Sequence, residues 1–381
     1  MKNIIVIPTY WTLPENDTSK TFDHPIPIKE KGTLERLLRS LRKLKNKCEI
    51  HIIISPLHKK VENKVRKITN EFPDLDIHVF TKIDLDKIRR LFKGVKLSGE
   101  FKSKISADTY GGIRNIGLII GIIKKIDNII FLDDDEVVEK DDFIIKAEEF
   151  MCKCYGMRKK LVGKTGYYVN KNNKFKQLKS PPPWKKHWLK QKHLNKVYNN
   201  IRAKKRLHET SNALGGNMVI NNLLFDVVPF DPYIPRGEDL DYLMNAKHFK
   251  FRFLFDNKLV IKHLPPPSRL PYWLKLRKDI HRFMYEREKM KLFNFGLDEL
   301  DSYPKFFLDK NLEYRAISTS VEYAKVCVKN GDMVGYRESL KNAQIVENSA
   351  KSYAKNNVHK YFKFQEDWVK FVKILKKKYR Q

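Results

Sequence analysis

Hydrophobic residues in the first third of the chain fall in short runs that are separated by helical patterns. The runs at 3–7, 49–55, 76–80 and 128–132 are apolar without alternation, as expected for strands buried on both faces of a sheet. Pro8 is expected to end the first run, because proline cannot donate a ladder hydrogen bond. The pattern predicts four buried strands.

Between these strands, apolar residues recur at i, i+3, i+4 and i+7, which predicts helices at 34–44, 58–72 and 111–125. Thr33 is expected to cap the first of them. The alternation of strands and helices predicts an α/β fold with a mostly parallel sheet flanked by helices. In such sheets, ligands bind beyond the carboxyl ends of the strands.

The rest of the chain reads as more α/β structure followed by helices alone. After a helix at 143–157, strands are predicted at 211–220 and 257–264, with a helix at 237–249 between them. Three prolines at 265–267 mark a boundary near residue 270. We therefore expect a domain at 1–270, divided into halves at about 1–140 and 141–270, and a basic helical C-terminal extension at 271–381.

Composition adds few limits to this picture. The chain has 381 residues, of which 41% are hydrophobic, enough for a sizeable core. Its longest apolar stretch, at 116–123, is too short to cross a bilayer, and the first residues do not resemble a signal peptide. The four cysteines form no disulfide or zinc pattern, so we expect a soluble cytoplasmic protein.

The charge is strongly positive, with 77 Lys and Arg against 45 Asp and Glu, a net of +32. Residues 179–206 hold ten cations and no acid, and residues 351–381 hold ten cations and two acids. Such clusters suit nucleic acid, anionic lipid or phosphorylated substrates, or they form a solvated surface. The sequence shows no zinc-finger spacing, RNP-like box or GXXG loop, so a basic nucleic-acid-binding protein is the weaker alternative.

Three aspartates, Asp133, Asp134 and Asp135, directly follow the apolar run at 128–132. A hard divalent cation, Mg²⁺ or Mn²⁺, takes such oxygen ligands and keeps positions open for substrate phosphates. The alternative is a solvated acidic turn or a cap for the next helix. Because the aspartates lie at the carboxyl end of a buried strand, we expect the ligand site there.

Two further polar groups can carry chemistry. Glu238 and Asp239 begin the helix that follows Gly237, where a carboxylate can act as a general base or simply stabilise the helix dipole. His263 ends a predicted strand and can complete a metal site, although a histidine there is as often an ordinary surface residue. Residue type alone does not decide between the functional and the structural role of either group.

The order of these segments resembles GT-A fold glycosyltransferases and is most similar to glycosyltransferase family 2. The resemblance rests on IIVIPTY at 4–10, the Arg-Asn-x-Gly helix and aspartate strand at 111–138, LGGNMVI at 214–220 and RGEDLDYLMNA at 236–246. It covers about residues 3–265. It implies a metal-dependent enzyme that transfers a sugar, a hexose in particular, from a nucleoside-diphosphate sugar to an acceptor hydroxyl.

The resemblance also implies a role for each matched residue. Asp133 and Asp135 match the Asp-x-Asp pair, and His263 falls at the place of a third ligand of Mn²⁺ or Mg²⁺. Asp239 is implied as the catalytic base, with Glu238 orienting the substrate. The donor-binding residues implied are Pro8, Tyr10, Arg114, Asn115, Asp133, Asp134, Gly215, Gly216 and Asn217.

Two features depart from the family pattern. The strand at 49–55 ends in Ser55, where family members usually carry an aspartate that reads the base, so the donor can be UDP- or GDP-linked. The loop at 10–32 is long and has no clear counterpart, and it lacks the Gly-rich basic loop of a nucleotidylyltransferase. Inversion with Asp239 as base is favoured. A strand-end histidine and a helical tail also resemble retaining synthases that make mannosylglycerate or glucosyl-phosphoglycerate.

The basic segments point to acceptors and partners. In GT-A enzymes the stretch at 179–206 borders the acceptor cleft, so its cations and aromatic residues can hold an anionic or sugar acceptor; otherwise it is a mobile loop. The basic helix at 273–293 and the last helix, with an apolar stripe from Tyr361 to Leu375, allow peripheral contact with the inner membrane face, where lipid-linked acceptors reside. The alternative is packing on the catalytic domain or in a homo-oligomer.

Overall fold

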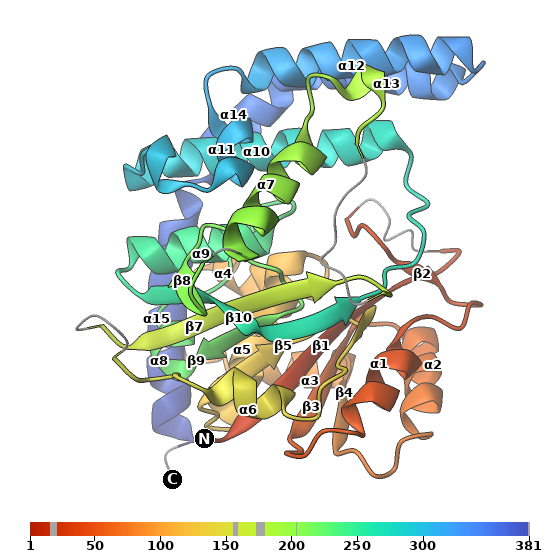
Figure 1. Ribbon diagram of the computed structural model, residues 1–381. Helices are drawn as coiled ribbons and strands as arrows, with labels where there is room; N and C mark the ends of the chain where they lie inside the picture. Colours follow the sequence, from red (N-terminus) through yellow and green to blue (C-terminus); the bar gives the residue numbers. More distant parts are fainter. Residues whose placement is uncertain (16–20, 155–158, 173–179, 203, 380–381) are drawn as a thin grey trace.

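A central sheet runs through the computed structural model, which describes residues 1–15, 21–154, 159–172, 180–202 and 204–379 (Figure 1). Its ten strands are β1 (Asn3–Thr12), β2 (Ile26–Pro27), β3 (Glu49–Ser55), β4 (Ile77–Phe80), β5 (Asn128–Phe131), β6 (Glu136–Val137), β7 (Leu161–Val169), β8 (Leu207–Glu209), β9 (Met218–Asn221) and β10 (Arg252–His263).

The strand order is β4-β3-β1-β5-β9-β7-β10-β6, with β2 paired to β1 and β8 to β10. Neighbours from β4 to β5 are parallel, as are β7 and β10, whereas β9 is antiparallel to both of its neighbours. The chain builds outward from β1 through β3 to β4 and then returns to place β5 on the other side of β1. The predicted α/β class with a mostly parallel sheet is confirmed, and the switch point lies between β1 and β5.

Helices flank this sheet, and a helical layer lies beyond one end of it, where α12 and α13 run side by side (Figure 1). The predicted helices at 34–44, 58–72, 111–125 and 237–249 are confirmed as α1, α2, α5 and α9. The helices are α1 (Leu34–Leu41), α2 (Lys59–Thr69), α3 (Lys82–Arg90), α4 (Gly99–Lys104), α5 (Tyr110–Ile123), α6 (Phe143–Glu148), α7 (Lys190–Arg202), α8 (Asn222–Phe225), α9 (Glu238–His248), α10 (Tyr272–Phe293), α11 (Ser302–Leu308), α12 (Leu312–Lys329), α13 (Met333–Ile345), α14 (Lys351–Asn357) and α15 (Lys360–Lys378).

Strand β1 was predicted to end at Pro8, and this prediction is wrong, because the strand continues to Thr12. The pairing of β1 with β5 ends at Val6, whose carbonyl accepts from the N–H of Leu132. In a parallel ladder alternate residues face the same neighbour, so residue 8 faces the side where this pairing has ended. The missing N–H of proline therefore interrupts no hydrogen bond, and Tyr10 is carried to the carboxyl end of the strand.

Two other predicted elements are shorter than expected. The helix expected at 143–157 ends as α6 at Glu148, because Phe150 and Cys152 adopt positive φ angles of 68° and 60°. The strand expected at 211–220 is reduced to β9, and the segment before it forms a turn. Thr33 precedes α1, but its side chain makes no capping hydrogen bond. The predictions at 155–157, 179, 203 and 380–381 lie outside the described residues.

The structure also contains elements that the sequence did not predict, chiefly β7 and α7. Two glycines interrupt the apolar pattern of β7, and both are required by packing. A Cβ at Gly163 would lie 2.2 Å from the Phe253 ring, and one at Gly166 would lie 1.8 Å from the carbonyl oxygen of Leu259. Helix α7 occupies part of the basic segment, which was left open as an acceptor surface or a loop.

The C-terminal helices pack on the sheet domain. The stripe predicted in the last helix is buried, and Trp368 and Tyr361 donate hydrogen bonds to the carbonyls of Phe225 and Pro229 at 2.9 Å and 3.0 Å. Within the described ranges, every helix is too short or too polar to span a bilayer. The boundary near residue 270 stays a prediction, and one hydrophobic core cluster runs from β1 to α15.

Helix α10 is joined to the sheet domain through buried charges. Lys289, which is fully buried, donates to the carboxylates of Asp231 and Asp241, each at 2.6 Å. The hydroxyl of Tyr285 also donates to Asp231, at 2.7 Å. Burial of charged groups is costly unless they are paired, so these contacts make α10 a required neighbour of α9.

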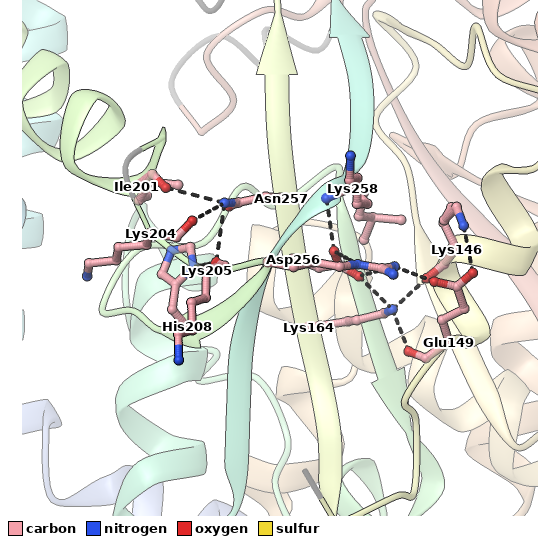
Figure 2. Close-up of polar contacts among 12 residues, drawn as sticks. Lys146, Glu149, Lys164, Ile201, Lys204, Lys205, His208, Asp256, Asn257 and Lys258 are labelled. Atoms are coloured by element: carbon pink, nitrogen blue, oxygen red, sulfur yellow. Dashed lines mark hydrogen bonds and ion pairs between the residues drawn. The ribbon is translucent and has the colours of Figure 1, made fainter. Parts of the chain in front are cut away.

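A second buried ion pair holds β7 to β10 (Figure 2). The ammonium of Lys164 lies 3.1 Å from the carboxylate of Asp256, and neither side chain has any exposed surface. Lys164 also donates to the carbonyls of Lys146 in α6 and of Glu149, the residue directly after α6. Arg206, which directly precedes β8, donates from its Nε to Asp256 at 3.0 Å. The cluster ties α6, β7, β10 and the start of β8 together.

Candidate functional site

A cavity of about 250 Å³ opens at the carboxyl ends of β1 and β5, where the sheet topology places a ligand site. Polar and charged side chains dominate its wall. The lining residues are Tyr10, Asp23, His24, Tyr110, Arg114, Asp133, Asp134, Asp135, Tyr168, Leu214, Gly215, Arg236, Gly237, Glu238, Asp239, His263 and Arg282. The three aspartates, the acidic pair of α9 and His263 therefore share one cavity.

Asp133 is held by Arg114, a buried residue of α5, whose Nη2 donates to Oδ1 at 2.9 Å. Burial and the charge of Asp135 raise the pKa of Asp133, although Arg114 opposes the shift. Burial likewise opposes the charge on Arg114, but Asp133 and Glu238 outweigh it and raise its pKa. Arg114 thus links the aspartates to α9, since its Nε lies 3.5 Å from the carboxylate of Glu238.

Asp134 turns toward the sheet, where the hydroxyl of Thr9 donates to its carboxylate at 2.5 Å. The residue is 8% exposed. Burial, together with the charge of Asp135, raises the pKa of Asp134 to about 8. An acidic group in this state would gain from a nearby cation, because the cation would offset the charge that burial disfavours.

Asp135 faces the end of β10, where its carboxylate lies 3.4 Å from Nε2 of His263. Tyr168 at the end of β7 stacks on the imidazole, with ring centroids 4.6 Å apart. The backbone carbonyl of Asp135 accepts from the N–H of Leu264 at 2.9 Å and from Arg36 at 3.2 Å. These contacts fix the loop after β5 against β10.

The donor set at this position fits a hard divalent cation. Two cis ligands of an octahedral Mg²⁺ ion, each at about 2.1 Å, lie about 3.0 Å apart, close to the separation of Asp135 and His263. In the part of the chain that the structure describes, no three His, Cys, Asp or Glu side chains are gathered as ready ligands of one ion. The carboxylate of Asp133 is directed at Arg114. A cation at Asp135 and His263 would therefore take its remaining ligands from water and substrate, or Asp133 would have to leave Arg114 to bind it.

The acidic pair lies at the start of α9, as predicted, after Gly237 in a left-handed conformation with φ of 78°. Burial and the charge of Asp239 raise the pKa of Glu238 to about 7. Asp239 is half-buried, and its Oδ1 accepts from the N–H of Leu240 at 2.8 Å. Its charge, after burial, helps to raise the pKa of Tyr198 to about 12, which places α7 beside the site.

The residues implied as donor-binding divide into two groups. Tyr10, Arg114, Asp133, Asp134 and Gly215 line the cavity. The other four, Pro8, Asn115, Gly216 and Asn217, are not among the described residues that line the cavity. Pro8 is paired with Ile53 within the sheet, and the N–H of Gly216 donates to the hydroxyl of Tyr168 at 3.0 Å.

Asn115 and Asn217 hold backbone instead. The Asn115 amide exchanges two hydrogen bonds with Phe230, both at 2.8 Å, and the Asn217 amide donates to the carbonyls of Tyr167 and Leu259. Both residues are fully buried. Their donor contact, like that of Pro8 and Gly216, stays a prediction, and the structure gives both asparagines a positioning role.

Several cavity residues were not singled out from the sequence. Asp23 and His24 come from the loop at 10–32, and Tyr10 stacks on Phe22 of the same loop with ring centroids 4.2 Å apart. Arg236 lies 2.8 Å from Asp23 and directly precedes Gly237. The other residues in this group are Tyr110, Tyr168 and Arg282. Arg236 is the first residue of the matched segment at 236–246, and this position is the signal in the sequence that could have drawn attention to it.

No protein-family model and no curated protein matches this chain. Among solved structures, a mannosyltransferase from Pyrobaculum calidifontis in complex with GDP-Man and Mn²⁺ is similar at 10% identity, over 96% of this chain and 86% of that chain, with a TM-score of 0.48. GalNAc-T7 with UDP, GalNAc and Mn²⁺ is similar at 12% identity, over 82% and 57%, with a TM-score of 0.42.

The apo form of mouse xyloside xylosyltransferase 1 is similar at 12% identity, over 66% of this chain and 78% of that chain, with a TM-score of 0.31. TM-scores below 0.5 carry no argument about activity or ligands. Membership of glycosyltransferase family 2 therefore stays a prediction that rests on the sequence segments.

Proposed function

We propose that this protein is a glycosyltransferase that moves a sugar, a hexose in particular, from a UDP- or GDP-linked donor to an acceptor hydroxyl. One observation carries the proposal: the aspartates after β5 and the acidic pair of α9 line one cavity at the switch point of the sheet. A divalent cation, Mn²⁺ or Mg²⁺, bound by Asp135 and His263 would offset the charge on the leaving diphosphate.

On the donor side, Arg114 has the geometry to hold a phosphate or a sugar hydroxyl. Its Nη1 is buried and has no hydrogen-bond partner among the described residues, while Nη2 is fixed by Asp133. Gly215 lies against the same guanidinium, since a Cβ there would be 2.8 Å from Nη2. Tyr10 lines the cavity and stacks on the buried Phe22, so it adds an aromatic surface that suits a base or a sugar.

On the acceptor side, Asp239 is the carboxylate that we assign as general base. It accepts the proton of the acceptor hydroxyl as that oxygen attacks the anomeric carbon, which gives inversion. Glu238 is held by Arg114 and orients the substrate. A retaining reaction needs no base opposite the leaving group, so the anomeric form of the product, measured by NMR, decides between the two.

The other partner and location hypotheses stay predictions. Peripheral contact with the inner membrane face, a homo-oligomer and a cytoplasmic location have no observation in their favour here. Nucleic-acid binding was based on charge alone, and part of that charge is buried in ion pairs, as at Lys164, Lys278, Arg282 and Lys289.

Binding of a nucleoside diphosphate tests the proposal directly. UDP or GDP with Mn²⁺, at about 100 times its Kd, should raise Tm by roughly 2 °C or more, and EDTA should remove the shift. Asp135→Asn should lose most of it, whereas a change at Asp141, an exposed partner of Lys45 after β6, should keep it when made as Asp141→Asn. Absence of any shift, together with no turnover of UDP- and GDP-sugars, would defeat the proposal.

A further inference from the structure

Helix α10 carries a charged stripe beside the cavity, and Arg282 of this stripe lines it. Lys275, Lys278, Asp279, Arg282 and Glu286 follow one another at helical spacing, and all of them except the half-buried Lys275 are at most 7% exposed. Charged side chains rarely occupy such positions unless they are paired or meet a ligand. The stripe forms one wall beside the cavity, and its charges need partners in the protein or in a ligand.

Ion pairs hold this wall to the loops around it. Asp279 accepts from Arg236 at 2.7 Å and from Lys190 of α7 at 3.2 Å. Asp23 lies 2.8 Å from Arg236 and 3.5 Å from Lys278. Together these contacts bring α7, α10, the loop at 10–32 and the residue before Gly237 to one place.

Cations outnumber carboxylates in this cluster. Its positive members are Lys185, Lys190, Arg236, Lys275, Lys278 and Arg282, and its negative members are Asp23, Asp239, Asp279 and Glu286. Burial and the neighbouring guanidiniums lower the pKa of Lys190 to about 8, and burial raises the pKa of Glu286 to about 7. The shift of Lys190 is in the direction expected where cations are in excess, and so is the pKa of Asp279, which Lys190, Arg236 and Arg282 lower to about 2 although burial opposes the change. The shift of Glu286 has another origin, namely burial and the charges of Asp241 and Asp239.

Arg282 carries this unbalanced charge to the cavity. Its Nε donates to Glu286 at 2.8 Å, but its Nη2 is buried and lacks a hydrogen-bond partner among the described residues. The guanidinium lies against Gly237, where a Cβ would be 2.2 Å from Cζ. It is thus adjacent to the acidic pair, and the charge of Asp239 acts on it.

We infer that the acceptor carries an anionic group, a phosphate monoester or a carboxylate, which binds Arg282 and Arg236 while its hydroxyl lies at Asp239. The inference rests on the proposed function and names the acceptor class for it. The donor diphosphate belongs elsewhere in the cavity, at Arg114 and the aspartates after β5. A planar guanidinium is well suited to either anion, because it offers two parallel N–H donors.

Glycerol phosphate and glycerol are matched probes of this site. Calorimetry should show that the intact protein in EDTA binds glycerol phosphate and does not measurably bind glycerol. Arg282→Gln should weaken binding by roughly tenfold to a hundredfold, as expected for loss of hydrogen bonds to a charged group, and Arg282→Lys by less. Lys275→Gln, at a half-buried position, should also weaken the binding of glycerol phosphate. This second variant tests the inference if Arg282→Gln does not fold. Arg337→Gln, an exposed change on α13, should have no effect.

Saturating UDP or GDP with Mn²⁺ then separates acceptor from donor. Continued binding of glycerol phosphate supports the inference, and complete displacement overturns it, because the anion would then occupy the diphosphate site. Equal binding by the native protein and both glutamine variants also overturns it. If no nucleotide binds while the anion does, the proposed function fails and so does the acceptor assignment, but the anion site remains. Vesicles of phosphatidic acid, compared with phosphatidylcholine, show whether a lipid can supply the phosphate.

Discussion

Asp239→Asn is expected to reduce sugar transfer by about 10²–10⁴-fold, the usual contribution of a positioned general base. The amide keeps the shape of the side chain but cannot accept the proton of an attacking hydroxyl. Asp239 is half-buried at the first turn of α9 and forms no ion pair within 4 Å in the described chain, although its charge acts on the nearby Arg282, so the fold should tolerate the change. Released nucleoside diphosphate and product formation measure the effect.

Two comparisons make this result specific. Binding of UDP or GDP with Mn²⁺ should remain close to that of the native protein, since the carboxylates after β5 are untouched. Asp86→Asn, a similar change at a partly exposed residue of α3, should leave transfer unchanged. If Asp239→Asn retains transfer, Asp239 is not the base, and the inverting scheme is wrong.

Asp256→Ala is expected to lower the free energy of unfolding by about 3–5 kcal/mol, the typical cost of leaving a buried charge unpaired. Lys164 would then be buried with its carboxylate partner gone, and Arg206 would lose its contact with β10. Burial already lowers the pKa of Lys164, so the ammonium has little to stabilise it without Asp256. Urea or thermal unfolding measures the change.

A double variant identifies the cause of that loss. Lys164→Met with Asp256→Leu removes both charges and keeps the volume filled, so it should recover most of the stability. Asp74→Ala removes a carboxylate that pairs with Arg42 at the surface, and it should cost no more than about 1 kcal/mol. A double variant as unstable as Asp256→Ala would contradict the explanation by unpaired charge.

Local patterns in the sequence were enough to predict the acidic residues of the candidate site and His263. Asp133, Asp134 and Asp135 follow an apolar run directly, and Glu238 and Asp239 follow a glycine at a helix start, so short stretches of sequence contain the whole signal. The switch point of a parallel sheet then brings the two groups to one edge. His263 was found for the same reason, since it ends a strand.

The remaining wall of the cavity depends on contacts between distant segments. Asp23 and Arg236 meet only because the loop at 10–32 folds back over the end of the sheet, and no spacing in the sequence records that contact. Arg282 lies on a basic helix for which the sequence left open both membrane contact and packing on the protein. The sequence does not show that the polar stripe of this helix is buried, which is what the structure shows. Helix α7 buries Val197 and Ile201, too little apolar surface to give a clear period.

The pairing of Lys289 with Asp231 and Asp241 has a consequence for the order in which the molecule is made. The two acids are translated 58 and 48 residues before their lysine. Until α10 has left the ribosome, the nascent chain holds two carboxylates without the cation that allows them to be buried, so α9 cannot settle into place. The acidic residues at the start of α9 therefore reach their final arrangement only after α10 has emerged.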